Sequence, residues 1–211
     1  MANILLFGLT GGIASGKSSI AKRWRQRGIP VIDADAVSRK VVEKGTIGLS
    51  DVVSGFGDEF LSEDGTLDRR KLGNFVFANP ESLRRLESIV WPHIDAEVKR
   101  ACAMFQSEGH LIACYEAAII VDQGHADRFR PLVTVHAPVE ERIRRMMKRD
   151  GHTEEQALQR LKAQVSDEVR NEAADYLISS DRPKEETVRV ADAVFEHICK
   201  SRKIDADRYS S

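Results

Sequence analysis

The stretch Gly8–Trp24, "GLTGGIASGKSSIAKRW", decides the fold because a glycine-rich turn in it joins an apolar run to a helical pattern. From Gly11 to Ser18 it matches G-x-x-x-x-G-K-[ST], the phosphate-binding P-loop. Glycines let such a loop close around an anion with its N–H groups pointing inward, and the following helix adds the positive end of its dipole. The stretch therefore predicts a site for nucleotide phosphates.

Each residue type in this loop has a separate task. In the motif, Lys17 reaches the β- and γ-phosphates and the Ser18 hydroxyl coordinates Mg²⁺, so we expect ATP with magnesium. The context fits, because "NILLFGLT" predicts a buried strand and "SSIAKRWRQRG" a helix that ends at Gly28. The alternative is a glycine-rich turn without a ligand, which this context disfavours. The residues expected to cradle the nucleotide are Gly11, Gly12, Ile13, Ala14, Ser15, Gly16, Lys17, Ser18 and Ser19.

Composition restricts the possible partners. The 211 residues suffice for one main domain, 1–211, and 32 basic against 33 acidic residues create no field for nucleic acid or a membrane surface. Cys102, Cys114 and Cys199 show no C-x-x-C spacing, which favours buried thiols in a reducing compartment over zinc or disulfides. No apolar run has membrane-spanning length, and "ILLF" is too short for a signal peptide. We expect a cytoplasmic monomer that acts on small molecules.

The remaining pattern predicts an α/β fold, namely a five-stranded parallel sheet flanked by helices. Its apolar runs, which alternate with helical patterns, are "ILLFGL", "PVIDA", "HLIACYEAAIIV", "PLVTVHA" and "DYLISS". Residues 36–108 show helical periodicity without a convincing strand, so we expect a helical substrate-binding subdomain there. Asn79-Pro80 predicts a helix start and Trp91-Pro92 a kink or break. The tail "DADRYSS" is expected to fray.

Three carboxylates belong to predicted strand ends, where ligands bind in open parallel sheets. Asp33 and Asp35 follow the second strand, and either can accept a proton or cap the next helix. We interpret Asp35 as the cap and Asp33, still on the strand, as the functional group. Glu116 follows the third strand, where it can face the metal directly or through water, or be a surface acid.

A second basic region, "RIRRMMKR", predicts a lid over residues 142–172. Arg142, Arg145 and Arg149 share one helix face by their spacing, whereas Arg144 and Lys148 are expected on a solvated face. Positive groups that close over a transferring phosphate neutralise its charge and exclude water. A turn at Gly151 and a helix start capped by Thr153 complete the predicted lid.

Together these runs resemble the dephospho-CoA kinase family along nearly the whole chain. The similar stretches are "LTGGIASGKS", "VIDADAVSR", "GTLDRRKLGNFVF", "RRLESIVWPHI", "RDGHTEEQALQRLKAQ" and "AADYLISS". The resemblance implies a P-loop kinase core with a helical substrate subdomain and a lid. It also implies transfer of the ATP γ-phosphate to the ribose 3′-hydroxyl of dephospho-CoA, the last step of coenzyme A synthesis.

The resemblance also implies roles for single residues. Asp33 matches the family's catalytic base, and Thr10 with the Gly11–Ser18 loop matches its phosphate cradle. The acceptor side is expected to include Thr10, Asp33, Arg39, Arg69 and Glu116. The catalytic positive charges are expected from Lys17, Arg145 and Arg149, of which Arg145 also touches the nucleotide. Polar lid positions are matched by Arg160 and Gln164.

The chain departs from the family pattern at four places. Trp91-Pro92 replaces histidine-proline, and Trp91 can stack on the acceptor's adenine or fill the subdomain core. Glu116-Ala-Ala118 replaces Asp-x-Pro. Arg142 replaces a glutamine before the lid arginines, and Ser179 or Ser180 replaces an asparagine, which leaves the adenine contacts of ATP unassigned.

Two rival functions are compatible with the P-loop alone. One is a P-loop kinase for a nucleoside, nucleotide or sugar, which would not require "DAD" followed by "LDRRKL". The other is a non-catalytic nucleotide-dependent switch, which needs neither a base at Asp33 nor an arginine lid. Both features are present, so the sequence favours an enzyme.

Overall fold

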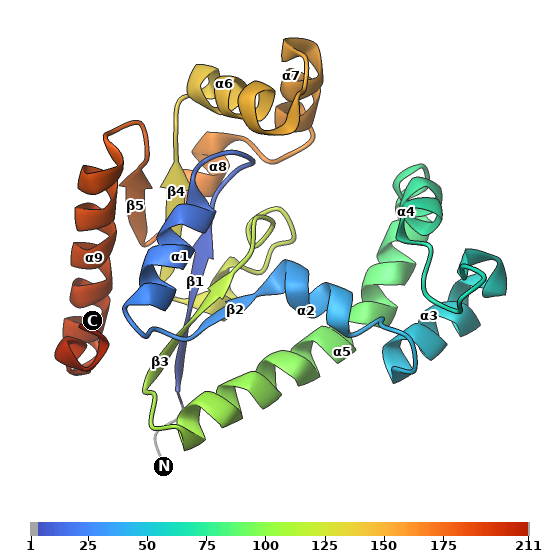
Figure 1. Cartoon of the computed structure of the whole chain (residues 1–211), viewed down its shortest axis with the longest axis horizontal. Coiled ribbons are helices and arrows are strands. Elements are labelled where there is room, and N and C mark those ends of the chain that lie inside the picture. Colours follow the sequence, from blue (N-terminus) through green and yellow to red (C-terminus); the bar gives the residue numbers. More distant parts are fainter. Residues whose placement is uncertain (1–3, 211) are drawn as a thin grey trace. The chain divides into compact units, whose positions relative to one another are not determined.

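The computed structural model describes residues 4–210 and contains the predicted sheet. The strands lie in the order β2-β3-β1-β4-β5 (Figure 1). β1 pairs in parallel with β3 and with β4, and β4 pairs in parallel with β5. The strand bounds are β1 (Leu5–Thr10), β2 (Val31–Asp33), β3 (Ile112–Glu116), β4 (Leu132–His136) and β5 (Tyr176–Ser179). The prediction of a five-stranded parallel sheet flanked by helices is confirmed.

The described chain divides into two compact units, residues 4–32 with 105–210 and residues 33–104. Within residues 4–210 no helix combines the length and the apolar character that a bilayer crossing requires. The helices of the first unit are α1 (Lys17–Gln26), α6 (Val139–Asp150), α7 (Glu154–Lys162), α8 (Asp167–Glu172) and α9 (Lys184–Ser201), with short 3₁₀ turns η2 (Ala126–Phe129) and η3 (Ala206–Tyr209).

The core of the first unit lies where α1 and α9 pack on one face of the sheet. Trp24 of α1 is fully buried, with its ring 5.3 Å from Phe7 of β1 and 6.2 Å from Phe195 of α9. Because side chains alternate along a strand, Thr134 points to the opposite face from Val133 and Val135. Its hydroxyl donates to the Arg170 carbonyl, which places α8 on that second face. The sheet is therefore covered on both faces, as the apolar runs predicted.

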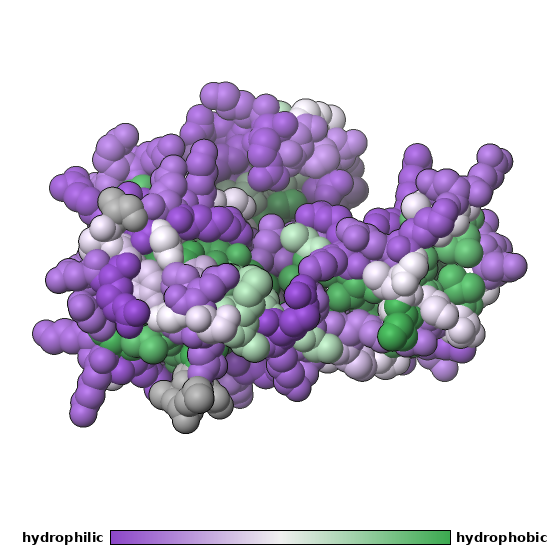
Figure 2. All heavy atoms as spheres, turned by 60° about the horizontal axis from the view of Figure 1, so that its bottom comes forward, coloured by the Kyte–Doolittle hydropathy of each residue, from purple (hydrophilic) through white to green (hydrophobic). Residues whose placement is uncertain are grey.

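Helices dominate the unit of residues 33–104, in keeping with the helical periodicity predicted for residues 36–108. The unit contains α2 (Ala34–Lys40), α3 (Ile47–Phe56), the 3₁₀ turn η1 (Asp58–Phe60), α4 (Arg69–Phe77) and most of α5 (Pro80–Ser107). Phe56, Phe60 and Phe75 pack edge-on or tilted against one another with ring centroids 5.3–6.4 Å apart. Figure 2 shows hydrophobic surface on this unit. Ile47 and Phe77 are among its exposed apolar side chains.

Helix α5 begins at the predicted place. The Asn79 side chain accepts from the amides of Glu81 and Ser82, which caps the helix. Pro92 does not break the helix, because α5 continues through it to Ser107, and Figure 1 shows it bending instead. Of the two outcomes predicted for Trp91-Pro92, a kink or a break, the helix therefore shows a kink.

The expectation that the C-terminal tail frays is wrong for residues 205–210, and Ser211 lies outside the described residues. Tyr209 is 2% exposed, and its ring packs against Phe195 and His110. Its carbonyl accepts from Arg27 Nε at 2.8 Å. The buried ring of Tyr209 therefore anchors the C-terminal tail to the first unit.

Candidate active site

The P-loop spans the gap between the end of β1 at Thr10 and the start of α1 at Lys17. Gly16 caps α1 in the left-handed region at φ 95°, which favours glycine. A Cβ at Gly12 would lie 2.3 Å from Arg142 Nη2, so only glycine fits there without displacing that side chain. Ala14 also has a left-handed φ of 59°, an uncommon conformation for a residue with a Cβ. The loop is thus held in one tight conformation.

Lys17 and Glu116 form an ion pair at the carboxyl end of the sheet. The distance from Lys17 Nζ to Glu116 Oε1 is 2.9 Å, and Arg25 Nη2 lies 3.1 Å from Glu116 Oε2. Glu116 is only 5% exposed, so the surface-acid alternative is wrong. Its carboxylate joins the P-loop lysine to a second cation on α1.

The serine hydroxyls of the loop have different environments. Ser18 and Ser19 are exposed in the first turn of α1, where the helix dipole favours an anion. Ser15 Oγ is buried and has no hydrogen-bond partner among the described residues. An exposed hydroxyl and an orphaned one fit a loop that binds a metal-nucleotide.

Thr10 is fully buried at the end of β1, and its hydroxyl donates to the Ala118 carbonyl at 3.3 Å. This bond ties the start of the P-loop to the segment after β3.

Two of the predicted lid arginines touch the P-loop: Arg142 binds the Ile13 carbonyl at 2.8 Å, and the second is Arg145. Its Nη1 donates to the Ala14 carbonyl at 3.2 Å and to Ser180 Oγ at 3.0 Å, and its Nη2 donates to the Ser180 carbonyl. Glu141, one turn earlier on α6, accepts from Arg145 Nε and from Arg144. The hydrogen bond from Arg144 and the one from Arg145 hold the pKa of Glu141 at about 2.

The three arginines predicted to form a stripe on one helix face have different environments. Arg142 is 3% exposed and turned into the protein, while Arg149 is exposed and pairs with its neighbour Asp150 at 2.7 Å. Arg144 and Lys148 are exposed, as predicted. A helix-face pattern could not reveal that the three arginines meet different partners.

The turn after α6 follows the sequence prediction. Gly151 caps the helix in the left-handed conformation at φ 68°, and Thr153 and Gln156 form a capping box at the start of α7. Arg160 is exposed on α7. Gln164 lies beyond it and accepts from the amide of Ile13 at 2.8 Å.

In the unit of residues 33–104, the aspartate that caps α2 is Asp33. Its Oδ1 accepts from the Ala36 amide at 3.0 Å, whereas Asp35 is exposed in the first helical turn. The interpretation of Asp35 as the cap is therefore wrong, since the helix begins directly after the strand. Among the described residues, the second oxygen of Asp33 has no recorded partner.

Arg39 and Arg69 lie close together in this unit. Arg69 Nη2 donates to the Arg39 carbonyl at 2.7 Å. Partial burial and the neighbouring charge of Arg39 lower the pKa of Arg69. The two arginines therefore bring two positive charges to one region of this unit.

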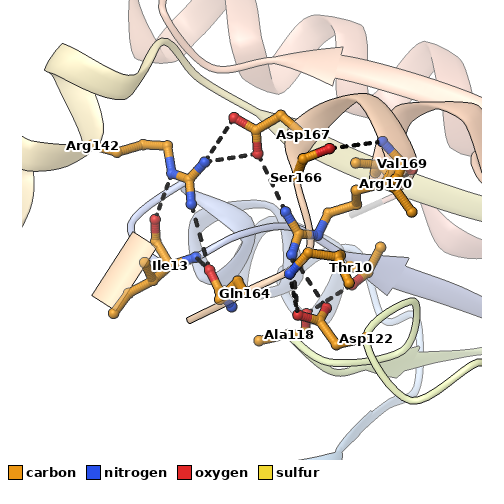
Figure 3. A network of polar contacts seen from close by, with 12 residues as sticks. Thr10, Ile13, Ala118, Asp122, Arg142, Gln164, Ser166, Asp167, Val169 and Arg170 are labelled. Atoms are coloured by element: carbon orange, nitrogen blue, oxygen red, sulfur yellow. Dashed lines mark hydrogen bonds and ion pairs between the residues drawn. The ribbon is translucent and has the colours of Figure 1, made fainter. Parts of the chain in front are cut away.

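Four charged residues that the motifs did not single out as partners form a network beside the P-loop (Figure 3). Asp167 accepts from Arg142 and Arg170, and Asp122 accepts from Arg170 at 3.2 Å. Asp122 also accepts from the amide of Val165 at 3.0 Å. The i, i+3 spacing of Asp167 and Arg170 is typical of an ion pair on one helix face. Nothing in the sequence linked this pair to Asp122 or Arg142.

The P-loop between β1 and α1, at the carboxyl edge of a parallel sheet and with an arginine from α6 on its outer side, defines a P-loop kinase. The sequence model of the dephospho-CoA kinase family matches residues 5–186. The chain belongs to the dephospho-CoA kinase family and is an ATP-dependent kinase, and the family reaction is the final step of coenzyme A biosynthesis.

Individual proteins show the same relationship. Dephospho-CoA kinase of Thermobifida fusca is 40% identical over 190 residues, 90% of this chain and 94% of that protein. The enzyme of Bdellovibrio bacteriovorus is 36% identical over 189 residues, again 90% of this chain and 94% of that protein. The crystal structure of TT1252 from Thermus thermophilus is 30% identical, with a TM-score of 0.80 over 92% of this chain and 98% of that one.

Proposed function

We propose that this chain transfers the γ-phosphate of ATP to the ribose 3′-hydroxyl of dephospho-CoA, giving coenzyme A and ADP. The observation that carries the proposal is the P-loop with Lys17 at the start of α1, in a chain that belongs to this kinase family. The acceptor follows from the resemblance of the "DAD" and "LDR" stretches.

The nucleotide side of the reaction is served by the loop and α1. The helix dipole and the Lys17 ammonium offset the negative charge that gathers on the phosphates as the bond to the leaving oxygen breaks. The Ser18 hydroxyl, exposed in the first turn of α1, would hold Mg²⁺, which would supply charge neutralisation to the phosphates. Lys17 exchanges its Glu116 partner for a phosphate oxygen, and Arg25 remains to hold Glu116.

The acceptor side is assigned to residues of the 33–104 unit. Asp33 orients the 3′-hydroxyl and takes its proton while that oxygen attacks the γ-phosphorus, and ADP leaves. The capping bond to Ala36 fixes one carboxylate oxygen, which leaves the other for the hydroxyl. Arg39 and Arg69 bind the acceptor's phosphates, an assignment that rests on the family resemblance and on the contact between these two cationic residues. Thr10 and Glu116 of the first unit are also assigned to acceptor binding.

The lid supplies positive charge around the transferring group. Arg145 already contacts the P-loop through the Ala14 carbonyl, and we assign it the nucleotide phosphates. Arg149 approaches the phosphates after leaving Asp150. The enzyme works as a cytoplasmic monomer on small molecules, without nucleic acid or a membrane.

A direct assay tests this function. Purified protein with Mg-ATP and dephospho-CoA should form coenzyme A and ADP in equal amounts, whereas shikimate, gluconate or nucleosides in place of dephospho-CoA should give ADP only at the background rate. Phosphorylation of one of those other acceptors at a higher kcat/KM would favour the rival small-molecule kinase. Nucleotide binding with no turnover on any acceptor would favour the switch.

A further inference from the structure

The outer side of the P-loop is held by hydrogen bonds to three consecutive carbonyl oxygens. Arg142 Nε donates to the Ile13 carbonyl at 2.8 Å, Arg145 to the Ala14 carbonyl and the Ser180 hydroxyl to the Ser15 carbonyl. Each carbonyl that is fixed on the outside fixes the orientation of the peptide that follows it. The residues that bind these carbonyls therefore influence how the loop presents its N–H groups.

The Ile13 residue is held on both of its backbone polar groups. Its amide donates to Gln164 Oε1 at 2.8 Å while its carbonyl accepts from Arg142 (Figure 3). Arg142 Nη2 also lies 3.5 Å from the same Gln164 oxygen. Arg142 and Gln164 thus form a closed clamp around one residue of the phosphate-binding loop.

Arg142 is itself held rigidly. Its side chain is 4% exposed, and Nη1 donates to both oxygens of Asp167 at 2.8 and 2.9 Å. Burial lowers the pKa of Arg142, although the carboxylate of Asp167 opposes that shift. Asp167 is in turn bound by Arg170, which Asp122 holds from the segment after β3. A chain of ion pairs therefore links α8 to Arg142, and through Arg142 to the carbonyl of Ile13.

We propose that Arg142 is a positioning residue that sets the P-loop for nucleotide phosphates by fixing Ile13 against α8. The proposal rests on the ATP site assigned above, and it concerns a residue outside the groups assigned to catalysis and to acceptor binding. The close approach of Arg142 to Gly12 supports it, because the guanidinium packs directly on the loop backbone. Arg144, two residues along the same helix, has no such role, since it is 69% exposed and pairs only with Glu141 among the described residues.

The test compares Arg142→Gln with Arg144→Gln in full-length protein. We measure KM for Mg-ATP, KM for dephospho-CoA, kcat, the affinity for ADP by calorimetry, and thermal unfolding. Arg142→Gln should raise KM for Mg-ATP and Kd for ADP by about 10-fold, the equivalent of one charge-assisted hydrogen bond, and change KM for dephospho-CoA less than about 2-fold. Arg144→Gln should leave both KM values, kcat and the affinity for ADP at the wild-type level, and should lower the thermal stability only slightly through loss of its surface pair with Glu141.

A purely structural Arg142 would give a different result. The melting temperature and the active fraction would fall, while KM for Mg-ATP and Kd for ADP of the folded protein stayed at wild-type values, and that outcome overturns the proposal. Arg142→Lys keeps the charge beside Asp167 but cannot hold Ile13 and Asp167 together. If Arg142→Gln does not fold, KM for Mg-ATP and Kd for ADP are measured on Arg142→Lys instead. A rise in both supports the proposal, and wild-type values overturn it. ADP binding needs no acceptor, so a wild-type protein that fails to phosphorylate dephospho-CoA would count against the proposed function and leave this comparison intact.

Discussion

Lys17 and Glu116 are joined by an ion pair of 2.9 Å in which the carboxylate is nearly inaccessible to solvent. Arg25 binds the other oxygen of Glu116, so the carboxylate keeps one cationic partner when Lys17 turns to a phosphate. A lysine that already has an alternative anion at hand can exchange partners without a charge being left unpaired, which would otherwise be costly in a buried site.

Lys17→Ala should lower kcat by more than about 10²-fold, because a positioned charge that stabilises the transferring phosphate is lost. The fold should persist, since Arg25 still neutralises Glu116. The measurement is the rate of coenzyme A formation, with circular dichroism as the check on folding. Lys22→Ala, an exposed lysine on the same helix, is the control and should behave as wild type. A wild-type rate for Lys17→Ala would contradict the P-loop assignment.

Arg145→Ala should lower kcat by about 10-fold or more, because Arg145 contacts the P-loop, whereas Arg144→Ala should have almost no effect. Arg149→Ala should also lower kcat more than Lys148→Ala, as the family match implies. Steady-state kinetics at saturating Mg-ATP measure both pairs. Equal losses in all four variants would indicate a diffuse electrostatic effect in place of the assigned positions.

Asp33→Asn should lower kcat by about 10²- to 10⁴-fold, because the amide cannot receive the proton of the acceptor hydroxyl. Asparagine caps helices as well as aspartate does, so the stability of α2 should be nearly unchanged. Asp35→Asn removes only an exposed charge from the first turn of α2 and should cost less than about 1 kcal/mol, with kcat near wild type. Coenzyme A formation and ATP affinity are measured for both variants. A greater loss of kcat in Asp35→Asn would mean that the base has been misassigned.

Glu141→Gln should destabilise the protein in a pH-dependent way. The arginine partners lower the pKa of Glu141 from its usual 4.5 to about 2, so the stabilisation is fully present above pH 4.5 and is lost as the pH falls toward 2. The pair lies at the surface, so the difference should be less than about 1 kcal/mol at pH 7. Thermal unfolding of wild type and variant between pH 2 and 7 measures it. A difference that grows as the pH falls would have the wrong sign for this ion pair.

The sheet and the P-loop could be predicted from sequence because their signals are local. Apolar runs of strand length, the glycines of residues 11–16 and the caps at Asn79 and Thr153 all act within a few residues of their own position. Alternation and capping chemistry are enough to place such elements. The helix predicted from Ser18 begins one residue earlier, at Lys17.

The environment of Arg142 could not be predicted in this way. Its spacing on α6 indicated an open face, yet its partners Ile13 and Asp167 lie 129 and 25 positions away in the chain. An arginine becomes buried only where such distant groups satisfy its donors, and helical periodicity carries no information about them. Asp33 shows a smaller version of the same problem, because α2 begins directly after β2 and the cap therefore lies two positions before the predicted Asp35.

The burial of Trp24 gives the protein a built-in optical reporter. Its indole Nε1 is buried without a hydrogen-bond partner among the described residues, and the ring lies between Phe7 and Phe195 on the helix that begins at Lys17. Fluorescence from such an indole lies at short wavelength and shifts to the red when water enters the core. The other tryptophan of the chain, Trp91, belongs to the unit of residues 33–104. In Trp91→Phe the remaining emission band would therefore report the unfolding of the unit that contains the P-loop, residues 4–32 with 105–210. In Trp24→Phe the remaining band would report the unfolding of the unit of residues 33–104.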